Sequence, residues 1–332
     1  MEKPIRVGLV GVGAISDWHV RAIRAVGMEV AAVSTRPGSA RLSDFARRHS
    51  IPEVSGGWRE MLARDGAFDA IVIATHTDGT PEILEASLLL GVPVLVEKPV
   101  AWSSDRLATL ASRAHPKVIV GFNRRFYRPV REARREAQGD GPLLVQATAP
   151  ESIDPPRADD PHPDSMRPFF ENSCHGIDLL RFLLGDLRID SVRRLETADG
   201  RLAGIAATLS TARGDVVSYL GNWSAPSNFG ICLFRGGRRF DLAPFEAATL
   251  YEGMDVIEPE AGSSIRRYIP RQTTRIELEE IDRIEKPGFV AQAAALKRLA
   301  EGGTAPPEAA TLEDARAAVE LCEALSGVRY AQ

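Results

Sequence analysis

Five short apolar runs, separated by segments of helical periodicity, constrain the first third of the chain more than any other feature. The runs are rich in β-branched residues and lie at 7–10, 30–33, 70–74, 92–96 and 118–120. Nearly continuous apolar strands that alternate with helices are typical of a parallel sheet covered by helices on both faces. The sequence therefore predicts a doubly wound α/β domain of the Rossmann type over residues 1–122.

The residues after 122 lose this alternation. An amphipathic segment at 127–138 and a strand-like segment at 143–148 come first. Residues 150–168 hold six prolines and five acids. This composition predicts a long loop, which either serves the function or is a surface excursion.

A helix at 174–184 and then short alternating strands from 189 to 269 follow the loop. Three turn signals between these strands are typical of hairpins: Asp199-Gly200, Arg213-Gly214 and Gly236-Gly237. Two helices, at 289–301 and 312–325, close the chain, and Thr311 with Asp314 forms a capping-box pattern before the second. We expect a second, α+β domain over residues 123–332, with a large and mainly antiparallel sheet.

The length and charge of the chain limit its partners and its location. Its 332 residues fit two domains, and its net charge of −4 offers no basic face to nucleic acid. No apolar run has transmembrane length, and the first residues lack the apolar stretch of a signal peptide, so we expect a cytoplasmic protein without membrane contact. The three cysteines are too far apart for a zinc site or a disulfide framework, and no metal is expected.

The turn after the first strand carries a dinucleotide-binding pattern, Gly11-Val12-Gly13-Ala14-Ile15-Ser16. Gly11 permits a tight turn, and Gly13 lets the backbone approach a pyrophosphate at the helix N-terminus. Ser16 stands where a third small residue usually keeps helix and strand close. Glycines alone also occur in tight structural turns, but the strand, turn, helix and strand around this pattern favour a bound dinucleotide.

The end of the second strand bears on the choice between NAD and NADP. An acid that binds the ribose diol of NAD is expected about twenty residues after the turn, and none is present there. Ser34, Thr35 and Arg36 stand there instead, and two hydroxyls with a guanidinium suit a 2′-phosphate. NADP is thus the preferred cofactor and NAD the alternative, in which Arg36 is simply a solvated loop residue.

Lys98 follows the fifth apolar run, at the edge of the sheet where ligands of open α/β sheets bind. Only five of the 41 basic residues are lysines. An ammonium can lose its proton when it is desolvated, whereas a guanidinium cannot. Lys98 is therefore a candidate for proton transfer, although Glu285-Lys286-Pro287 repeats its tripeptide without a preceding strand.

These motifs together resemble the glucose-fructose oxidoreductase, inositol dehydrogenase and rhizopine-catabolism (Gfo/Idh/MocA) family over essentially the whole chain. The pattern comprises the glycine turn, Ile73-Ala74-Thr75, Glu97-Lys98-Pro99, Gly121-Phe122-Asn123-Arg124-Arg125 and a later helix that bears His175. The resemblance implies a Rossmann domain, a second domain whose sheet often forms a homodimer or homotetramer, and a sugar, nucleotide-sugar or cyclitol substrate lying between the domains.

The resemblance also implies roles for single residues. Lys98 and His175 would act on the substrate hydroxyl or carbonyl, with Glu171 in support. A histidine suits this task because its ordinary pKa lies near neutrality, and Glu171 shares a helical face with it at a spacing of four. The alternative for His175 is a satisfied core residue. Further expected cofactor contacts are Ala14, Ile15, Thr75, His76 and Glu97, and further substrate contacts are Asn123, Arg125, Tyr127 and Asn172.

One departure from the family pattern leaves two other functions open. The family commonly has Asp where this chain has Glu171, with glycines around it, whereas this chain reads Phe169-Phe170-Glu171-Asn172-Ser173-Cys174-His175. A catalytically silent relative that binds cofactor and sugar as a sensor or partner subunit is one alternative. A reductase of a non-carbohydrate carbonyl or imine, favoured by the two phenylalanines, is the other.

Overall fold

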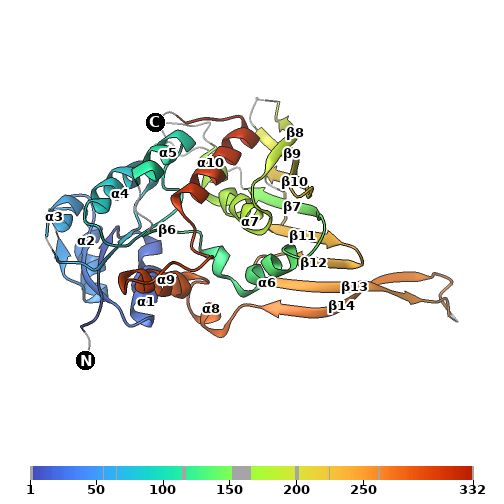
Figure 1. The fold of residues 1–332 in the computed structure, drawn as a ribbon, viewed down its shortest axis with the longest axis horizontal. Coiled ribbons are helices and arrows are strands. Elements are labelled where there is room, and N and C mark those ends of the chain that lie inside the picture. The colour runs from blue at the N-terminus through green and yellow to red at the C-terminus, as the bar shows by residue number, and fades with distance from the viewer. Residues whose placement is uncertain are drawn as a thin grey trace. The chain divides into compact units, whose positions relative to one another are not determined.

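The computed structural model describes residues 3–54, 56–64, 66–113, 117–151, 166–198, 202–223, 225–260 and 262–330. The chain divides into two compact units, Met1–Phe126 with Glu280–Gln332, and Tyr127–Glu279. Each unit contains one sheet (Figure 1). The C-terminal helices belong to the first unit, whereas the sequence-based division placed everything after residue 122 in one substrate domain. The assignment of dinucleotide binding to residues 1–122, and of substrate binding and oligomerisation to residues 123–332, stays a prediction.

The first unit contains a sheet of six parallel strands in the order β3-β2-β1-β4-β5-β6, which confirms the doubly wound prediction. Its strands are β1 (Arg6–Val10), β2 (Glu29–Ser34), β3 (Glu53–Val54), β4 (Ala70–Ile73), β5 (Val94–Val96) and β6 (Val118–Val120). The strand order reverses between β1 and β4, where open α/β sheets bind ligands at their carboxyl edge.

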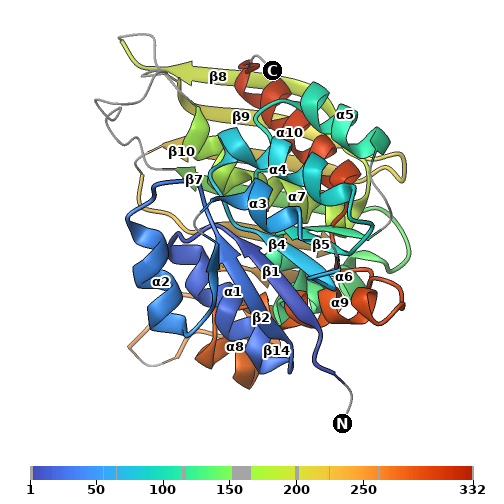
Figure 2. The same cartoon turned by 90° about the vertical axis from the view of Figure 1, so that its left-hand side faces the viewer.

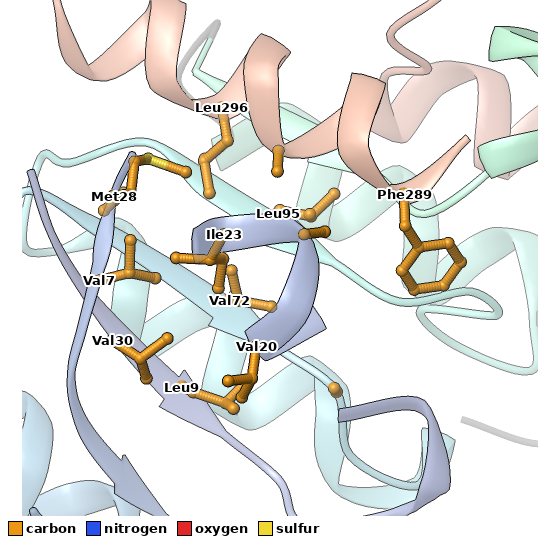
Figure 3. Packing of buried hydrophobic residues seen from close by; sticks show 14 of the residues in the cluster. Val7, Leu9, Val20, Ile23, Met28, Val30, Val72, Leu95, Phe289 and Leu296 are labelled. Carbon is orange, nitrogen blue, oxygen red and sulfur yellow. The ribbon is translucent and has the colours of Figure 1, made fainter. Parts of the chain in front are cut away.

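Helices cover both faces of this sheet. One face packs against α1 (Ala14–Ala25), α2 (Arg41–His49) and α9 (Phe289–Ala300), whose buried side chains form one apolar cluster with Val7, Val72 and Leu95 (Figure 3). On the other side lie α3 (Trp58–Leu62), α4 (Thr80–Leu88), α5 (Ser104–Arg113) and α10 (Leu312–Ser326) (Figure 2). Both faces of each central strand are thereby removed from water, which explains the continuous apolar runs.

The chain returns to the first unit through α8 (Glu280–Ile284) and the two C-terminal helices. The predicted capping box is present, since the Thr311 hydroxyl accepts a hydrogen bond from the Asp314 backbone and the Asp314 carboxylate accepts one from the Thr311 backbone. Arg125, after β6, lies 3.2 Å from the Asp314 carboxylate. Burial opposes the charged form of Asp314, but the Arg125 charge and hydrogen bonds from Thr311 hold the pKa of Asp314 below its ordinary value.

The second unit is built on a sheet of eight strands in the order β14-β13-β12-β11-β7-β10-β9-β8. The strands are β7 (Leu144–Glu151), β8 (Arg188–Glu196), β9 (Leu202–Ser210), β10 (Val216–Trp223), β11 (Gly230–Arg235), β12 (Arg238–Leu242), β13 (Ala247–Ile257) and β14 (Arg267–Glu277). All neighbours are antiparallel except β7 and β10, which run parallel at the centre. The hairpins at Arg213-Gly214 and Gly236-Gly237 are confirmed, and Asp199-Gly200 lies outside the described residues.

One face of this second sheet is covered and the other is open. Side chains alternate between buried and exposed along β7 and β10, as expected for a sheet with one face against a core. The helices of this unit are α6 (Arg128–Ala137), which contacts β12 to β14, and α7 (Cys174–Leu184), which packs on α6. On the open face Leu144, Val216 and Leu220 are between 42% and 58% exposed.

All three cysteines are free thiols, and Cys174 and Cys322 are buried. Burial, with a further contribution from the negative charge of Asp241, raises the pKa of the half-buried Cys232 to about 12. A raised pKa favours the protonated thiol at neutral pH, which is a poorer nucleophile than the thiolate. No helix among the described residues is long and apolar enough to cross a membrane.

Candidate functional site

The turn after β1 has the geometry that its glycines predict. Gly11 has a φ of +116°, and a Cβ at this position would lie 2.1 Å from the Ala74 carbonyl oxygen. The Gly11 backbone N–H donates to the Ser34 carbonyl at 2.8 Å. The first turn therefore touches the ends of both β4 and β2, and only glycine fits there.

The N-terminus of α1 is shaped to receive a group from outside the chain. Gly13 is its N-cap residue and makes no side-chain capping bond. A Cβ added to Gly13 would meet no described atom within 4 Å, so the backbone lies open to a ligand here. The positive end of the helix and the N–H groups of its first turn favour an anion, and a dinucleotide pyrophosphate fits. The Ser16 side chain is fully buried and its hydroxyl has no hydrogen-bond partner among the described residues.

The end of β2 differs in part from its sequence-based interpretation. The Ser34 side chain is fully buried, so it does not face a ribose. Thr35 is half-buried and Arg36 is exposed. Thr35 and Arg36 are thus the accessible groups that could meet a ribose or its phosphate.

The ends of β4 and β5 bring further predicted residues to the same edge. After β4, the Thr75 hydroxyl lies 2.8 Å from the Thr80 hydroxyl, and the exposed His76 lies 3.1 Å from Asp78. After β5, the half-buried Glu97 and Lys98 follow in sequence. The Glu97 carboxylate lies 2.8 Å from Nε2 of His19, a residue of α1.

The side chains of the predicted substrate contacts after β6 are almost fully buried, which leaves little of their surface for a substrate. Asn123 and Arg125 are 7% and 3% exposed, and Tyr127 is 4% exposed. The Asn123 side chain donates to the Pro287 carbonyl at 2.9 Å, and Arg125 pairs with Asp314. These contacts fasten the returning C-terminal segment to the first unit, so the two side chains have a structural task.

Glu171 and His175 occur in the second unit, at a change of helix type. Residues Phe169–Ser173 form a π-helical turn that continues directly into α7. Such turns are frequent at functional sites. Glu171 is half-buried, Asn172 is exposed, and His175 is 7% exposed on the first turn of α7.

The two phenylalanines of this turn belong to the core rather than to a binding surface. Phe169 and Phe170 are 1% and 0% exposed. Phe169 stacks on Trp223 with ring centroids 5.7 Å apart and meets Phe170 edge-on. Their presence therefore lends no support to an aromatic substrate.

Comparisons with known proteins agree with this geometry. Residues 5–122 match the family model described as "Oxidoreductase family, NAD-binding Rossmann fold". This is the model of the Gfo/Idh/MocA family, and the match is confined to these residues. An inositol 2-dehydrogenase of Rhizobium meliloti is 29% identical over 191 residues, which are 55% of this chain and 56% of that protein. The matched stretch thus spans little more than half of this relative.

Two further proteins match over nearly their full lengths. The rhizopine catabolism protein MocA of Rhizobium meliloti is 26% identical over 96% of this chain and 93% of its own. The structure of UDP-N-acetylglucosamine 3-dehydrogenase GnnA from Acidithiobacillus ferrooxidans has a TM-score of 0.73 at 16% identity, over 98% of both chains. At 16% identity, the similarity to the GnnA structure shows a shared fold and nothing more.

Two polar groups near these sites were not predicted from the sequence. His19 is one of them. Its position among the core-facing residues of α1 was the sequence signal that could have revealed it, because a titratable side chain in a core needs a polar partner. Glu151, at the end of β7, is the other; it is 6% exposed and accepts hydrogen bonds from the Ser173 hydroxyl and the Asn172 amide. Glu151 thereby fastens the π-helical turn that precedes His175. Its contribution could not be predicted, because it depends on which strand lies beside the turn.

The second Glu-Lys-Pro tripeptide, at 285–287, contributes to the packing of the first unit. Glu285 accepts a hydrogen bond from Arg21 of α1 at 2.8 Å, and the Lys286 ammonium lies over the Phe289 ring at 5.7 Å. The Pro287 carbonyl accepts the bond from Asn123. Among the described residues, no group of three or more His, Cys, Asp or Glu side chains could hold a metal ion.

Proposed function

We propose that this protein is a nicotinamide-dependent dehydrogenase or ketoreductase that acts on a hydroxyl or keto carbon of a cyclitol, sugar or nucleotide sugar. The observation that carries the proposal is the position of Lys98, directly after β5, on the sheet edge where the Gly11–Gly13 turn receives a dinucleotide. The names of the inositol 2-dehydrogenase and MocA relatives support the substrate class.

In the proposed reaction, the bound nicotinamide supplies or accepts the hydride. The residues of the chain handle the proton that accompanies it. His175 takes the hydroxyl proton as the carbonyl forms, because imidazole exchanges a proton near neutral pH. Lys98 polarises the same oxygen through its ammonium, and Glu171 orients the imidazole. The uncapped N-terminus of α1 binds the pyrophosphate.

NADP is the proposed cofactor over NAD. The exposed Arg36 and the half-buried Thr35 offer a charge-assisted contact to a 2′-phosphate, and the end of β2 carries no acid that would repel it. Ser34 has no part in this proposal, because its side chain is buried.

A second copy of the chain is the proposed partner, bound through the open face of the eight-stranded sheet. Exposed apolar side chains in neighbouring strands form an unusual surface for a monomer. Leu144 and Val216 lie directly opposite each other in the parallel pair, and Leu220 lies on the same face.

A coupled spectrophotometric screen tests the proposed activity. Wild-type protein is mixed with NADP⁺ or NAD⁺ and a panel of cyclitols and sugars, beginning with myo-inositol, and with the reduced cofactors and the matching keto compounds. Saturable turnover of at least one polyol is expected. Tight dinucleotide binding without any turnover would favour a silent sensor or partner subunit, and preference for a non-carbohydrate carbonyl or imine would favour the other alternative.

A further inference from the structure

A buried carboxylate lies beside the π-helical turn that leads into α7. Glu151 is the last residue of β7, and it is 6% exposed. Its Oε1 accepts a hydrogen bond from the Ser173 hydroxyl, and the amide nitrogen of Asn172 lies 3.4 Å from its Oε2. Asn172 and Ser173 are the last two residues of the turn. The carboxylate thus fastens the end of the turn to the eight-stranded sheet.

An aromatic contact holds the other end of the same turn. Phe169, the first residue of the turn, is 1% exposed and stacks on Trp223 with ring centroids 5.7 Å apart. Trp223 is the last residue of β10 and lies opposite Glu151 in the parallel pair of β7 and β10. The two central strands therefore end in the two side chains that hold the turn, one at its beginning and one at its end.

The position of the turn determines where His175 lies. The turn continues into α7 without a break, and His175 follows Ser173 by two residues. A shift of the turn therefore moves the imidazole with it. Proton transfer tolerates little such movement, because a misplacement of about 1 Å can lower a rate by about 100-fold.

We propose that Glu151 is a positioning residue for His175, acting through the π-helical turn. The contacts of its carboxylate with Ser173 and Asn172 fix the place of the turn, and the turn fixes the place of the imidazole. The catalytic consequence rests on the proposed function, in which His175 takes the substrate proton. The structural part rests only on contacts inside the second unit.

The first unit offers a matched control for this contact. The Ser104 hydroxyl donates a hydrogen bond at 2.7 Å to the carboxylate of Glu323, which is 4% exposed. Ser104 begins α5 and Glu323 lies on α10, so this pair also fastens the start of a helix. Replacing Ser173 or Ser104 with Ala removes the same hydroxyl from the same kind of buried carboxylate, but only one of the two changes concerns His175.

The two serine variants are compared with the wild type on a polyol that the wild type oxidises. We expect Ser173→Ala to lower kcat by about 10- to 100-fold while the Kd for the reduced dinucleotide changes by less than about twofold, because the imidazole is displaced and the Gly11–Gly13 turn is not. Ser104→Ala should lower the Tm about as much as Ser173→Ala but leave kcat within about twofold.

Two further readouts distinguish positioning from a general loss of stability. A displaced imidazole slows the proton transfer itself, so the solvent deuterium isotope effect on kcat should be larger in Ser173→Ala than in the wild type, and unchanged in Ser104→Ala. Glu151→Gln keeps an acceptor oxygen for the Ser173 hydroxyl and should retain most of kcat, whereas Glu151→Leu keeps none and should lose as much as Ser173→Ala.

Hydrogen–deuterium exchange measures the structural part without activity. Peptides that cover residues 166–180 should exchange about tenfold faster in Ser173→Ala and Glu151→Leu than in the wild type, because a lost hydrogen bond to a charged group makes local opening easier. Ser104→Ala should leave these peptides unchanged and speed exchange only at the start of α5.

The outcomes separate the positioning role from the proposed function. If the wild type turns over a polyol but Ser173→Ala and Glu151→Leu lose no more activity than Ser104→Ala, the positioning role is overturned and the proposed function stands. If the wild type turns over nothing, the proposed function is overturned, and with it the catalytic consequence. Exchange then decides the structural part by itself, because equal exchange at 166–180 in all the proteins contradicts it.

Discussion

Lys98 is one of five lysines in a chain that otherwise uses arginine for positive charge. Replacing it with Met keeps the length of the side chain and removes the ammonium. We expect Lys98→Met to lower kcat by about 10²- to 10⁴-fold, the usual contribution of an acid–base group, with little change in dinucleotide affinity. Steady-state kinetics and a dinucleotide titration measure the two effects, and Lys117→Met is the matched control. Turnover equal to that of the wild type would exclude Lys98 from the reaction.

A substitution at Arg36 tests the proposed preference for NADP over NAD. Loss of a hydrogen bond to a charged phosphate costs about 1.5–3 kcal/mol, so Arg36→Ala should weaken NADPH binding by about 10- to 100-fold and leave NADH binding almost unchanged. Fluorescence titrations of both cofactors provide the measurement. Arg47→Ala, which changes an exposed arginine on α2, is the control. Equal loss for both cofactors would contradict contact with the 2′-phosphate.

Single residues were predictable from the sequence where their role is local. The need for glycine at position 11 follows from the fingerprint, and its φ of +116° bears this out. The burial of Ser34 and of Asn123 was not predictable, because it depends on segments that pack there from elsewhere in the chain. Asn123, for example, meets Pro287, which is 164 residues away.

At the scale of elements, Asp215 in the β9–β10 turn makes the stability of the fold depend on pH. Burial alone would raise the pKa of Asp215, but hydrogen bonds from Thr211, Arg213 and the Leu143 backbone, with the Arg213 charge, hold it below its ordinary value. A lowered pKa in the folded state gives stability that is present above the ordinary carboxyl pKa of about 3.9 and is lost as the pH falls below it.

Asp215→Asn therefore should destabilise the protein most at neutral pH, and its difference from the wild type should shrink below about pH 4 as the native carboxylate takes up a proton. Urea unfolding between pH 7 and pH 3 measures this difference, and the exposed Asp140→Asn is the control. A difference that is independent of pH would contradict the account.

Elements of strong periodicity were predictable, and those set by long-range pairing were not. The helix predicted at 174–184 has the bounds of α7, and all five apolar runs contain strands. The two-residue β3 and the five-residue α8 are too short to give a periodic pattern. β7 pairs with β10 in parallel at the centre of the sheet. This pairing depends on contacts between strands that are far apart in the sequence, so no local sequence pattern predicts it.

At the scale of the whole molecule, the open sheet face predicts self-association. Leu220→Glu places a charge among exposed apolar side chains, where burial against a second copy would be costly. We expect the wild type to sediment as a dimer or tetramer and the variant to shift towards the monomer, with unchanged circular dichroism. Ile284→Glu, which changes another exposed apolar residue in the first unit, should not alter assembly. A monomeric wild type would contradict the proposed partner.

The return of α8, α9 and α10 to the first unit is the largest feature that the sequence did not reveal. The amphipathic patterns of α9 and α10 predict that each of these two helices covers an apolar surface, but either sheet offers one. The choice is made by specific contacts, such as that of the Lys297 ammonium with the Val26 carbonyl at 3.0 Å.

Titration of the purified wild-type protein with NADPH and NADH, followed by nicotinamide fluorescence, tests the central claim most directly. The account predicts saturable binding of both cofactors, with NADPH bound more tightly. Failure of both to bind would contradict a functional dinucleotide site at the Gly11–Gly13 turn, and with it the proposed oxidoreductase activity.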